Sequence, residues 1–119
     1  MLSPLRRPVP SRWRGSLFAA VALVSAGGFL RTVNAADANI SIDNFTFKPA
    51  EITVPAGTRV TWTNNDDIPH VVVDAKDPQA MKSAPLDTGD KFAFVYAKPG
   101  TYVYFCALHP HMQGTVIVK

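Results

Sequence analysis

From Asn39 onward, hydrophobic and polar residues alternate in short runs, and no stretch keeps the 3.6-residue period of a helix. β-Branched and aromatic residues occupy the hydrophobic positions, as in the pair Ile40 and Ile42. Turn signals such as Pro55-Ala56-Gly57 and Lys98-Pro99-Gly100 separate the runs. This pattern predicts an all-β domain built from short strands.

We expect seven to eight strands in an antiparallel sandwich or barrel, because short runs spaced by turns are typical of those architectures. The longest irregular stretch is residues 74–90, which are polar and contain two prolines and a glycine. The expected strands are 40–42, 45–47, 52–54, 59–64, 70–73, 91–96, 101–106 and 115–119.

Two of these strands should bring polar groups to one edge of the core. Successive side chains of a strand point to opposite faces, so Tyr102, Tyr104 and Cys106 share one face. Trp62 must face inward, and Asn64, two positions later at the end of its strand, then faces inward too. A thiol and an amide at neighbouring strand ends indicate a functional site.

The first 35 residues have a different pattern. Residues 1–14 are basic, Gly15 to Leu30 form an uncharged run of 16, and Val33-Asn34-Ala35 places small or compact residues where a signal peptidase reads. A charged start, an apolar middle and such a site are typical of a secretory signal. We therefore expect a signal peptide spanning residues 1–35.

Cleavage after Ala35 or Ala36 would leave a domain of residues 36–119 in the periplasm. An uncleaved membrane anchor is the alternative, but a bilayer span needs about 20 apolar residues and this run is shorter. Arg6-Arg7 hints at the twin-arginine route. Prolines and Trp13 follow where that signal has an apolar continuation, which favours the Sec route.

Charge is divided unevenly between the two parts. The whole chain has 12 Lys and Arg against 9 Asp and Glu, yet residues 1–35 hold five arginines and no acid. Residues 36–119 carry seven basic and nine acidic side chains, so neither nucleic acid nor an anionic membrane is an expected partner. A single cysteine excludes an internal disulfide framework. We expect a monomer held together by its core.

Four residues that can ligate a metal lie within one short segment, namely Cys106, His109, His111 and Met112. A fifth donor, His70, follows a proline at the start of another expected strand. A thiolate and two imidazoles in a trigonal arrangement, with a weak axial thioether, describe a type 1 copper site. Soft sulfur suits Cu(I) and imidazole suits both oxidation states, so such a site needs little rearrangement during electron transfer.

Each residue alone has a plainer interpretation: Cys106 and Met112 as core residues, and His70 as a surface residue. Together, the four residues in this strand order favour a metal. Zinc would accept Cys and two His, but a thioether is a poor zinc ligand. A nucleophilic Cys–His pair lacks an evident orienting carboxylate near the segment.

The sequence resembles the cupredoxins in Trp62-Thr63-Asn64, in Ile68-Pro69-His70 and in the segment from Gly100 to Gly114. The resemblance spans residues 38–119 and is strongest to the amicyanin branch, which has the same Cys-x2-His-x2-Met spacing. It implies a Greek-key β-sandwich or barrel of seven to eight strands that binds one copper ion.

The resemblance also implies roles for individual residues. The metal ligands would be His70, Cys106, His109 and Met112. Asn64 would tether the two ligand loops, the Val71 backbone N–H would point at the Cys106 sulfur, and Tyr102 would bond a neighbouring loop.

Leu108 stands where amicyanins have proline, and His111 stands where they have phenylalanine. Some cupredoxins place the ligand at the spacing of His111, but their methionine comes several residues later, so His109 is preferred as the ligand. The expected mature domain would begin almost at its first core strand, without the N-terminal extension of amicyanins. This difference and the altered residues 108 and 111 argue against the redox partner of amicyanins.

The family suggests that electrons leave through the exposed edge of His109. An apolar docking patch would surround it, formed by Ile68, Pro69, Leu108, Pro110 and His111, with Met81 as a further candidate. Acidic residues around it would steer a basic partner, namely Asp66, Asp67, Asp74, Asp77, Asp87 and Asp90.

We expect a periplasmic one-electron carrier that cycles between Cu(II) and Cu(I) with transient protein partners, a dehydrogenase or a cytochrome. The alternative is a copper carrier or metallochaperone without redox cycling, suggested by the extra donor His111. An enzyme is not expected, because three histidines cannot build the additional cluster of a multicopper oxidase.

Overall fold

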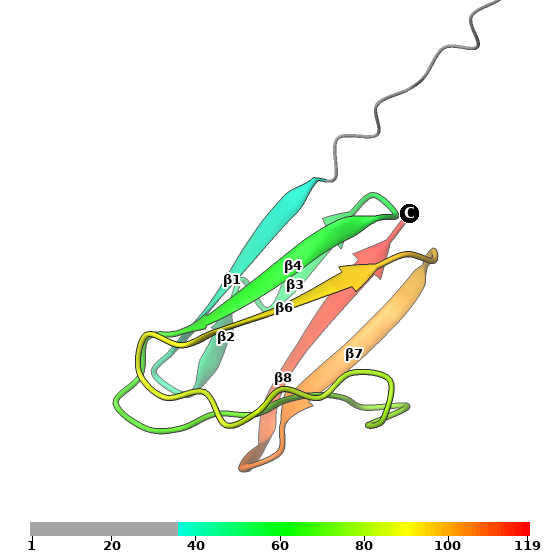
Figure 1. Ribbon diagram of the computed structural model, residues 1–119. Coiled ribbons are helices and arrows are strands. Elements are labelled where there is room, and N and C mark those ends of the chain that lie inside the picture. Colours follow the sequence, from blue (N-terminus) through cyan, green and yellow to red (C-terminus); the bar gives the residue numbers. More distant parts are fainter. Residues whose placement is uncertain (1–35) are drawn as a thin grey trace, which may run out of the picture. The chain divides into compact units, whose positions relative to one another are not determined.

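The computed structural model describes residues 36–119, and the expected signal peptide, residues 1–35, lies outside that range. Eight strands in two sheets make up the described part, as the sequence pattern predicted (Figure 1). No helix within it could span a bilayer. The strands are β1 (Asp37–Asp43), β2 (Thr46–Lys48), β3 (Glu51–Val54), β4 (Thr58–Asn64), β5 (Val72–Asp74), β6 (Lys91–Tyr96), β7 (Gly100–Cys106) and β8 (His109–Val118).

The two sheets are mixed: four of the six strand pairings are antiparallel, as expected, and the other two are parallel. One sheet has the order β2-β1-β4-β6 and the other has the order β3-β8-β7-β5. Strand β1 pairs with β4 in parallel, and β3 pairs with β8 in parallel. The chain crosses between the sheets after each of the strands β2 to β6, so strands distant in sequence become neighbours in one sheet.

Two strand boundaries near the expected site also differ from the sequence pattern. β5 begins at Val72, and His70 instead forms an isolated bridge with Leu86 of the 74–90 stretch. β8 begins at His109, six positions before the expected start, because Ala107 and Leu108 make a two-residue turn after β7. Cys106 and His109 consequently pair directly across this β7–β8 hairpin.

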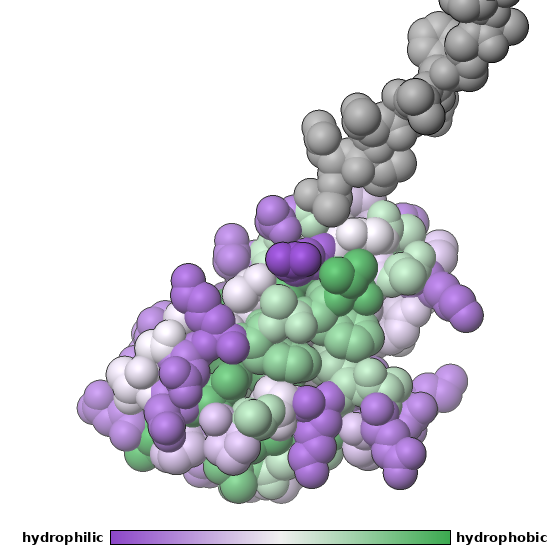
Figure 2. Space-filling model, in the orientation of Figure 1, coloured by the Kyte–Doolittle hydropathy of each residue, from purple (hydrophilic) through white to green (hydrophobic). Residues whose placement is uncertain are grey.

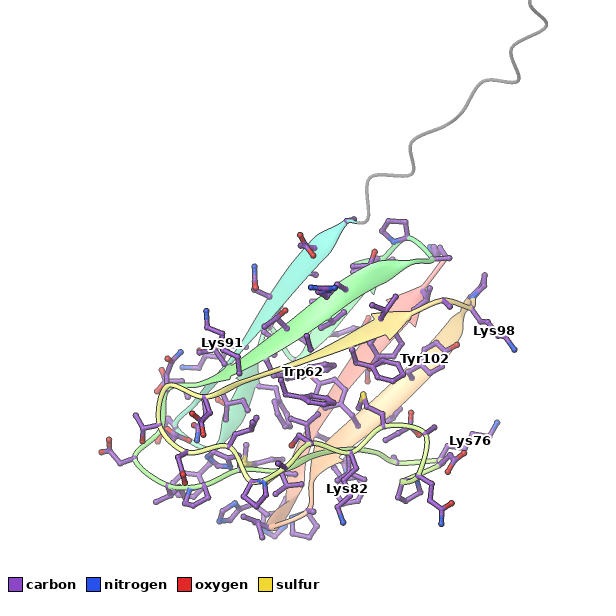
Figure 3. The ribbon with its side chains drawn as sticks, viewed as in Figure 1. Trp62, Lys76, Lys82, Lys91, Lys98 and Tyr102 are labelled. Atoms are coloured by element: carbon purple, nitrogen blue, oxygen red, sulfur yellow. The ribbon has the colours of Figure 1, made fainter. Side chains whose placement is uncertain are left out.

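The predicted inward faces are confirmed. Trp62, Asn64 and Cys106 have no exposed surface, and Tyr104 is 1% exposed. The Trp62 and Tyr104 rings meet edge to face with centroids 5.2 Å apart. Figure 3 shows the Trp62 side chain pointing into the space between the two sheets. A Cβ at Gly114 would lie 2.2 Å from the Tyr104 ring, so only glycine fits at that position of β8.

Hydrophilic side chains surround a more hydrophobic middle on the face viewed in Figure 2. Val95 of β6 is 49% exposed, as alternation on a half-covered sheet allows. Tyr102 donates a hydrogen bond from its hydroxyl to the Lys98 carbonyl at 2.7 Å, which fastens the turn between β6 and β7 (Figure 3). This contact agrees with the loop-bonding role expected of Tyr102.

The turn between β1 and β2 overturns one further expectation. Phe45 was expected in a strand with Phe47, but Asn44 and Phe45 form a two-residue turn with φ values of 51° and 58°. Positive φ at both central residues defines a type I′ turn, which favours Asn-Gly. Holding Phe45 in this left-handed conformation costs about 1–2 kcal/mol. A strained aromatic residue therefore occupies a position suited to glycine.

Candidate metal centre

Three donor groups converge at one end of the sandwich, where β7 ends and β8 begins. The Sγ atom of Cys106 lies 3.6 Å from Nδ1 of His70 and 3.8 Å from Nδ1 of His109. Within residues 36–119 these are the three residues whose donor atoms all lie within 4.8 Å of one another. His70 arrives from 36 positions earlier in the chain, just before β5.

These separations fit a single metal ion. Metal–sulfur and metal–nitrogen bonds of about 2.3 and 2.0 Å, about 110–120° apart, separate the donor atoms by roughly 3.5–3.7 Å. The observed sulfur–nitrogen distances of 3.6 and 3.8 Å match this value. Distance alone suits zinc and copper equally, so the decision between them rests on the chemistry of the donors.

Met112 is the fourth ligand expected from the sequence, and it is buried close to the hairpin in the chain. It lies on β8 three residues after His109, is 5% exposed and belongs to the same buried cluster as Cys106. The two residues between them, Pro110 and His111, are exposed. A buried thioether beside a thiol and two imidazoles favours copper over zinc.

His70 is completely buried, and its second ring nitrogen has a defined partner. Nε2 lies 2.8 Å from Oδ2 of Asp66. A carboxylate only accepts hydrogen bonds, so in the neutral imidazole Nε2 carries the proton and the lone pair lies on Nδ1. Such a contact fixes the orientation of a ligating histidine.

The carboxylate of Asp66 accepts two further hydrogen bonds, from the backbone N–H of Asn44 at 2.6 Å and of Phe45 at 3.0 Å. Burial alone would raise its pKa, but the hydrogen bonds from Phe45, His70 and Asn44 outweigh burial and leave the pKa below its usual 3.8. From the sequence, Asp66 was expected only as a steering charge. An acid inside a polar loop carries no local signal of these distant contacts.

Cys106 is also fixed by its neighbours. The Val71 N–H donates to its Sγ at 3.4 Å, as the resemblance implied. The Ala107 N–H donates to the Val71 carbonyl at 3.0 Å. These two hydrogen bonds fix the segment after His70 against the end of β7. They therefore hold the Cys106 sulfur at a fixed distance from the His70 imidazole.

The side chain of Asn64 makes three hydrogen bonds, but its partners differ from those expected. Its Nδ2 donates to the carbonyls of Ile68 at 2.8 Å and Leu86 at 2.7 Å, and its Oδ1 accepts from the Asp66 N–H at 2.9 Å. Asn64 therefore binds the loop before His70 to the 74–90 stretch, rather than to the segment after Cys106. The short β7–β8 turn leaves that segment paired within its own hairpin.

Phe45 lies against both imidazoles. Its ring meets His70 at a centroid distance of 5.8 Å and His109 at 5.2 Å, nearly perpendicular to each. Phe45 is 48% exposed, so one side covers the histidines while the other faces solvent. The sequence analysis missed this contact, because Phe45 lies 25 positions before His70 and was expected in a strand.

Most residues of the expected docking patch are exposed, and two are not. Pro69, Pro110 and His111 are exposed and Leu108 is 52% exposed, whereas Ile68 is only partly so. Met81 is 3% exposed and accepts a hydrogen bond from the Tyr96 hydroxyl at 3.4 Å. Met81 therefore belongs to the core and not to the patch.

Four of the six acids expected to steer a partner accept backbone hydrogen bonds in loops: Asp66, Asp74, Asp77 from the Gln79 N–H at 3.1 Å, and Asp90 from the Asp87 N–H at 2.9 Å. The Asp66 carboxylate is bonded to the Asn44–Phe45 turn and to His70. Asp74 is 8% exposed and caps a turn by accepting from the N–H groups of Lys76 and Asp77 at 2.8 and 2.9 Å.

Comparison with known proteins agrees with this geometry. The sequence model of the cupredoxin-like domain family matches residues 16–118. Amicyanin-alpha of Methylorubrum extorquens is 32% identical over 107 residues, which cover 86% of this chain and 90% of that protein. The chloroplastic plastocyanin of Tetradesmus obliquus is 34% identical over 111 residues, covering 81% and 77%.

Among solved structures, a purple cupredoxin from Nitrosopumilus maritimus superposes with a TM-score of 0.64 at 36% identity. The superposition covers 70% of this chain and all of that one. The fold, the convergent donors and these relatives together show that the chain belongs to the cupredoxin family and binds one copper ion.

Proposed function

We propose that this protein is a type 1 copper protein that carries single electrons in the periplasm. The proposed ligands are Nδ1 of His70, Sγ of Cys106, Nδ1 of His109 and Sδ of Met112. One observation carries the proposal: a buried thiol lies 3.6 and 3.8 Å from two imidazole nitrogens, at the separation that a single ion requires. Copper supplies the one-electron chemistry when bound.

The chain contributes rigidity to that chemistry. Asp66 fixes the ring of His70, and the Val71 N–H holds the Cys106 sulfur. Neither donor can move far without breaking its hydrogen bond, which keeps the rearrangement between oxidation states small. The complete burial of His70 and Cys106 excludes water from their side of the site.

The partly exposed ring of His109 is the proposed exit for the electron. Phe45 and Leu108 flank it with exposed apolar surface. Small apolar surfaces of this kind suit the weak interfaces of transient redox partners. We propose a dehydrogenase or a cytochrome as the partner class, and a monomeric carrier.

Copper binding is tested with the purified domain of residues 36–119. Adding Cu(II) should produce an intense thiolate-to-copper charge-transfer band that disappears on reduction and returns on oxidation. Cys106→Ser should remove the band, because a hydroxyl cannot replace the thiolate. A colourless copper adduct of the unaltered domain would refute the type 1 site.

The choice between the two histidines of the hairpin is tested by a matched pair of variants. His109→Ala should abolish or strongly alter the band, because its Nδ1 faces the sulfur. His111→Ala should leave the band nearly intact, since His111 is exposed and lies outside the donor cluster of the described residues. The reverse outcome would reassign the ligand to His111.

Export is tested at the N-terminus of the protein expressed from the full chain. Mass spectrometry of the exported product should show a chain that begins at Ala36 or Asp37. A product that keeps residues 1–35 would show an uncleaved anchor instead.

A copper carrier without redox cycling is the second candidate, favoured by the exposed donor His111 close to the proposed ligands His109 and Met112. Rapid copper transfer to an acceptor protein, with no electron transfer to dehydrogenases or cytochromes, would support it. The burial of His70 and Cys106 argues against it, because rapid ligand exchange needs accessible donors.

A further inference from the structure

We propose that Phe45 is a cover over the two imidazoles and that Asp66 is the positioning residue that holds both the cover and His70. The cover would keep small external ligands away from the ion. This proposal rests on the ligand set proposed above, and it adds a role for two residues outside that set.

The contacts of Phe45 define the cover. Its ring meets the rings of His70 and His109 edge to face, while the two imidazole centroids lie 5.2 Å apart. One aromatic ring thus spans both histidines on the solvent side, and it is itself 48% exposed. Removing the ring would open a route from solvent to the donor atoms.

The backbone shows that this placement is enforced. Phe45 has a φ of 58° in a turn position that favours glycine. A residue keeps such a conformation only where its surroundings over-determine it, and such sites cluster around functional centres. Here the surroundings are the Asp66 carboxylate, which accepts from the N–H groups of both turn residues, Asn44 and Phe45.

The same carboxylate couples the cover to the buried histidine. Oδ2 of Asp66 accepts from both the Phe45 N–H and Nε2 of His70, and Oδ1 accepts from the Asn44 N–H. An amide of the same shape offers only one accepting atom. Asp66→Asn must therefore leave a donor facing a donor, either at the turn or at His70.

The positioning role is tested without metal. In Asp66→Asn, hydrogen exchange of the Asn44 and Phe45 amides should accelerate by about tenfold or more, because bonds to a charged acceptor are lost. Nitrogen NMR should also show that His70 no longer holds its proton on Nε2 alone. The control is Asp67→Asn, which removes the same charge from an exposed neighbour. Equal exchange rates and an unchanged His70 signal in Asp66→Asn would overturn the positioning role.

The cover is tested with the Cu(II) domain and azide as the external ligand. In Phe45→Gly, azide should perturb the charge-transfer band at a concentration at least about tenfold lower than in the unaltered domain, because the shielding contacts are gone. Glycine suits the turn, so the variant should fold. Val95→Ala, which trims an exposed apolar residue elsewhere, should respond like the unaltered domain.

An equal azide response in Phe45→Gly and the unaltered domain would overturn the cover. Failure of the proposed function has a different signature: the unaltered domain itself would show no charge-transfer band. The metal-free exchange experiment would still decide the role of Asp66 in that case.

Discussion

Single residues in this protein have roles that their own chemistry does not reveal. Gly114 shows this most directly, because it has no side chain and matters only through Tyr104. The Tyr104 ring and hydroxyl fill the place where a Cβ would lie, 2.2 Å away. Tyr104 in turn packs on Trp62 and is two residues before the Cys106 donor.

Gly114→Ala should therefore lower the free energy of unfolding of the metal-free domain by about 1–3 kcal/mol through overpacking. Urea unfolding followed by Trp62 fluorescence measures this change. The control is Gln113→Ala at an exposed neighbouring position of the same strand, which should change stability by less than about 0.5 kcal/mol. Equal stabilities would show that Tyr104 can move aside at no cost.

At the scale of elements, loops rather than strands bring His70 to the site. The bridge between His70 and Leu86 and the hydrogen bonds of Asn64 tie the loop after β4 to the stretch before β6. One bridge, a few backbone hydrogen bonds and one buried side-chain amide thus hold these loops in place of a longer strand ladder.

Asn64→Ala should destabilise the domain by about 2–3 kcal/mol, because it removes the partner of the Ile68 carbonyl and of the Asp66 N–H and leaves the Leu86 carbonyl with the His70 N–H alone. Copper should also dissociate faster, since His70 is no longer held from both sides. Denaturant unfolding and chelator-driven copper loss measure the two effects. Asn65→Ala is the comparison, because its amide makes an exposed bond to Ser41. Matching effects of the two variants would count against a special role for Asn64.

The sequence predicted most strands and the inward faces of Trp62 and Cys106, because period-two alternation is a local property. It did not predict the parallel pairing of β1 with β4, which depends on crossovers between sheets. It also missed the contacts of Phe45, whose partners Asp66, His70 and His109 lie 21, 25 and 64 positions away. Contacts between a turn and a distant loop leave no periodic trace in the chain.

For the whole molecule, the buried tyrosines make the stability of the core depend on pH. Burial raises the pKa of Tyr104 to about 12, although the Trp62 indole N–H acts in the opposite direction. Burial, together with the charges of Tyr104, Asp74 and Tyr102, also raises the pKa of Tyr96. Two of the three tyrosines of the chain therefore stay neutral in the folded state at pH values that ionise them in an unfolded chain.

Alkaline pH should consequently unfold the domain. Because the pKa of Tyr104 is raised in the folded state, its contribution to the free energy of unfolding is complete below the unfolded pKa of about 10. That contribution is lost as the pH rises towards 12. The loss amounts to on the order of 3 kcal/mol for Tyr104. Tyrosinate absorbance should rise together with the loss of tertiary structure. Smooth ionisation of all tyrosines in a folded domain would contradict this expectation.

The 36 positions between His70 and Cys106 have a consequence for how the chain assembles. Cys106 and His109 become neighbours as soon as one hairpin closes, whereas His70 joins them only after the loops before β5 and β6 have settled. Closing the longer chain loop between His70 and Cys106 is the slow step, because it costs more conformational entropy. When the domain refolds with copper present, the charge-transfer absorbance should therefore appear only in the last stage of folding. Its rate of appearance would then report when His70 joins Cys106 and His109.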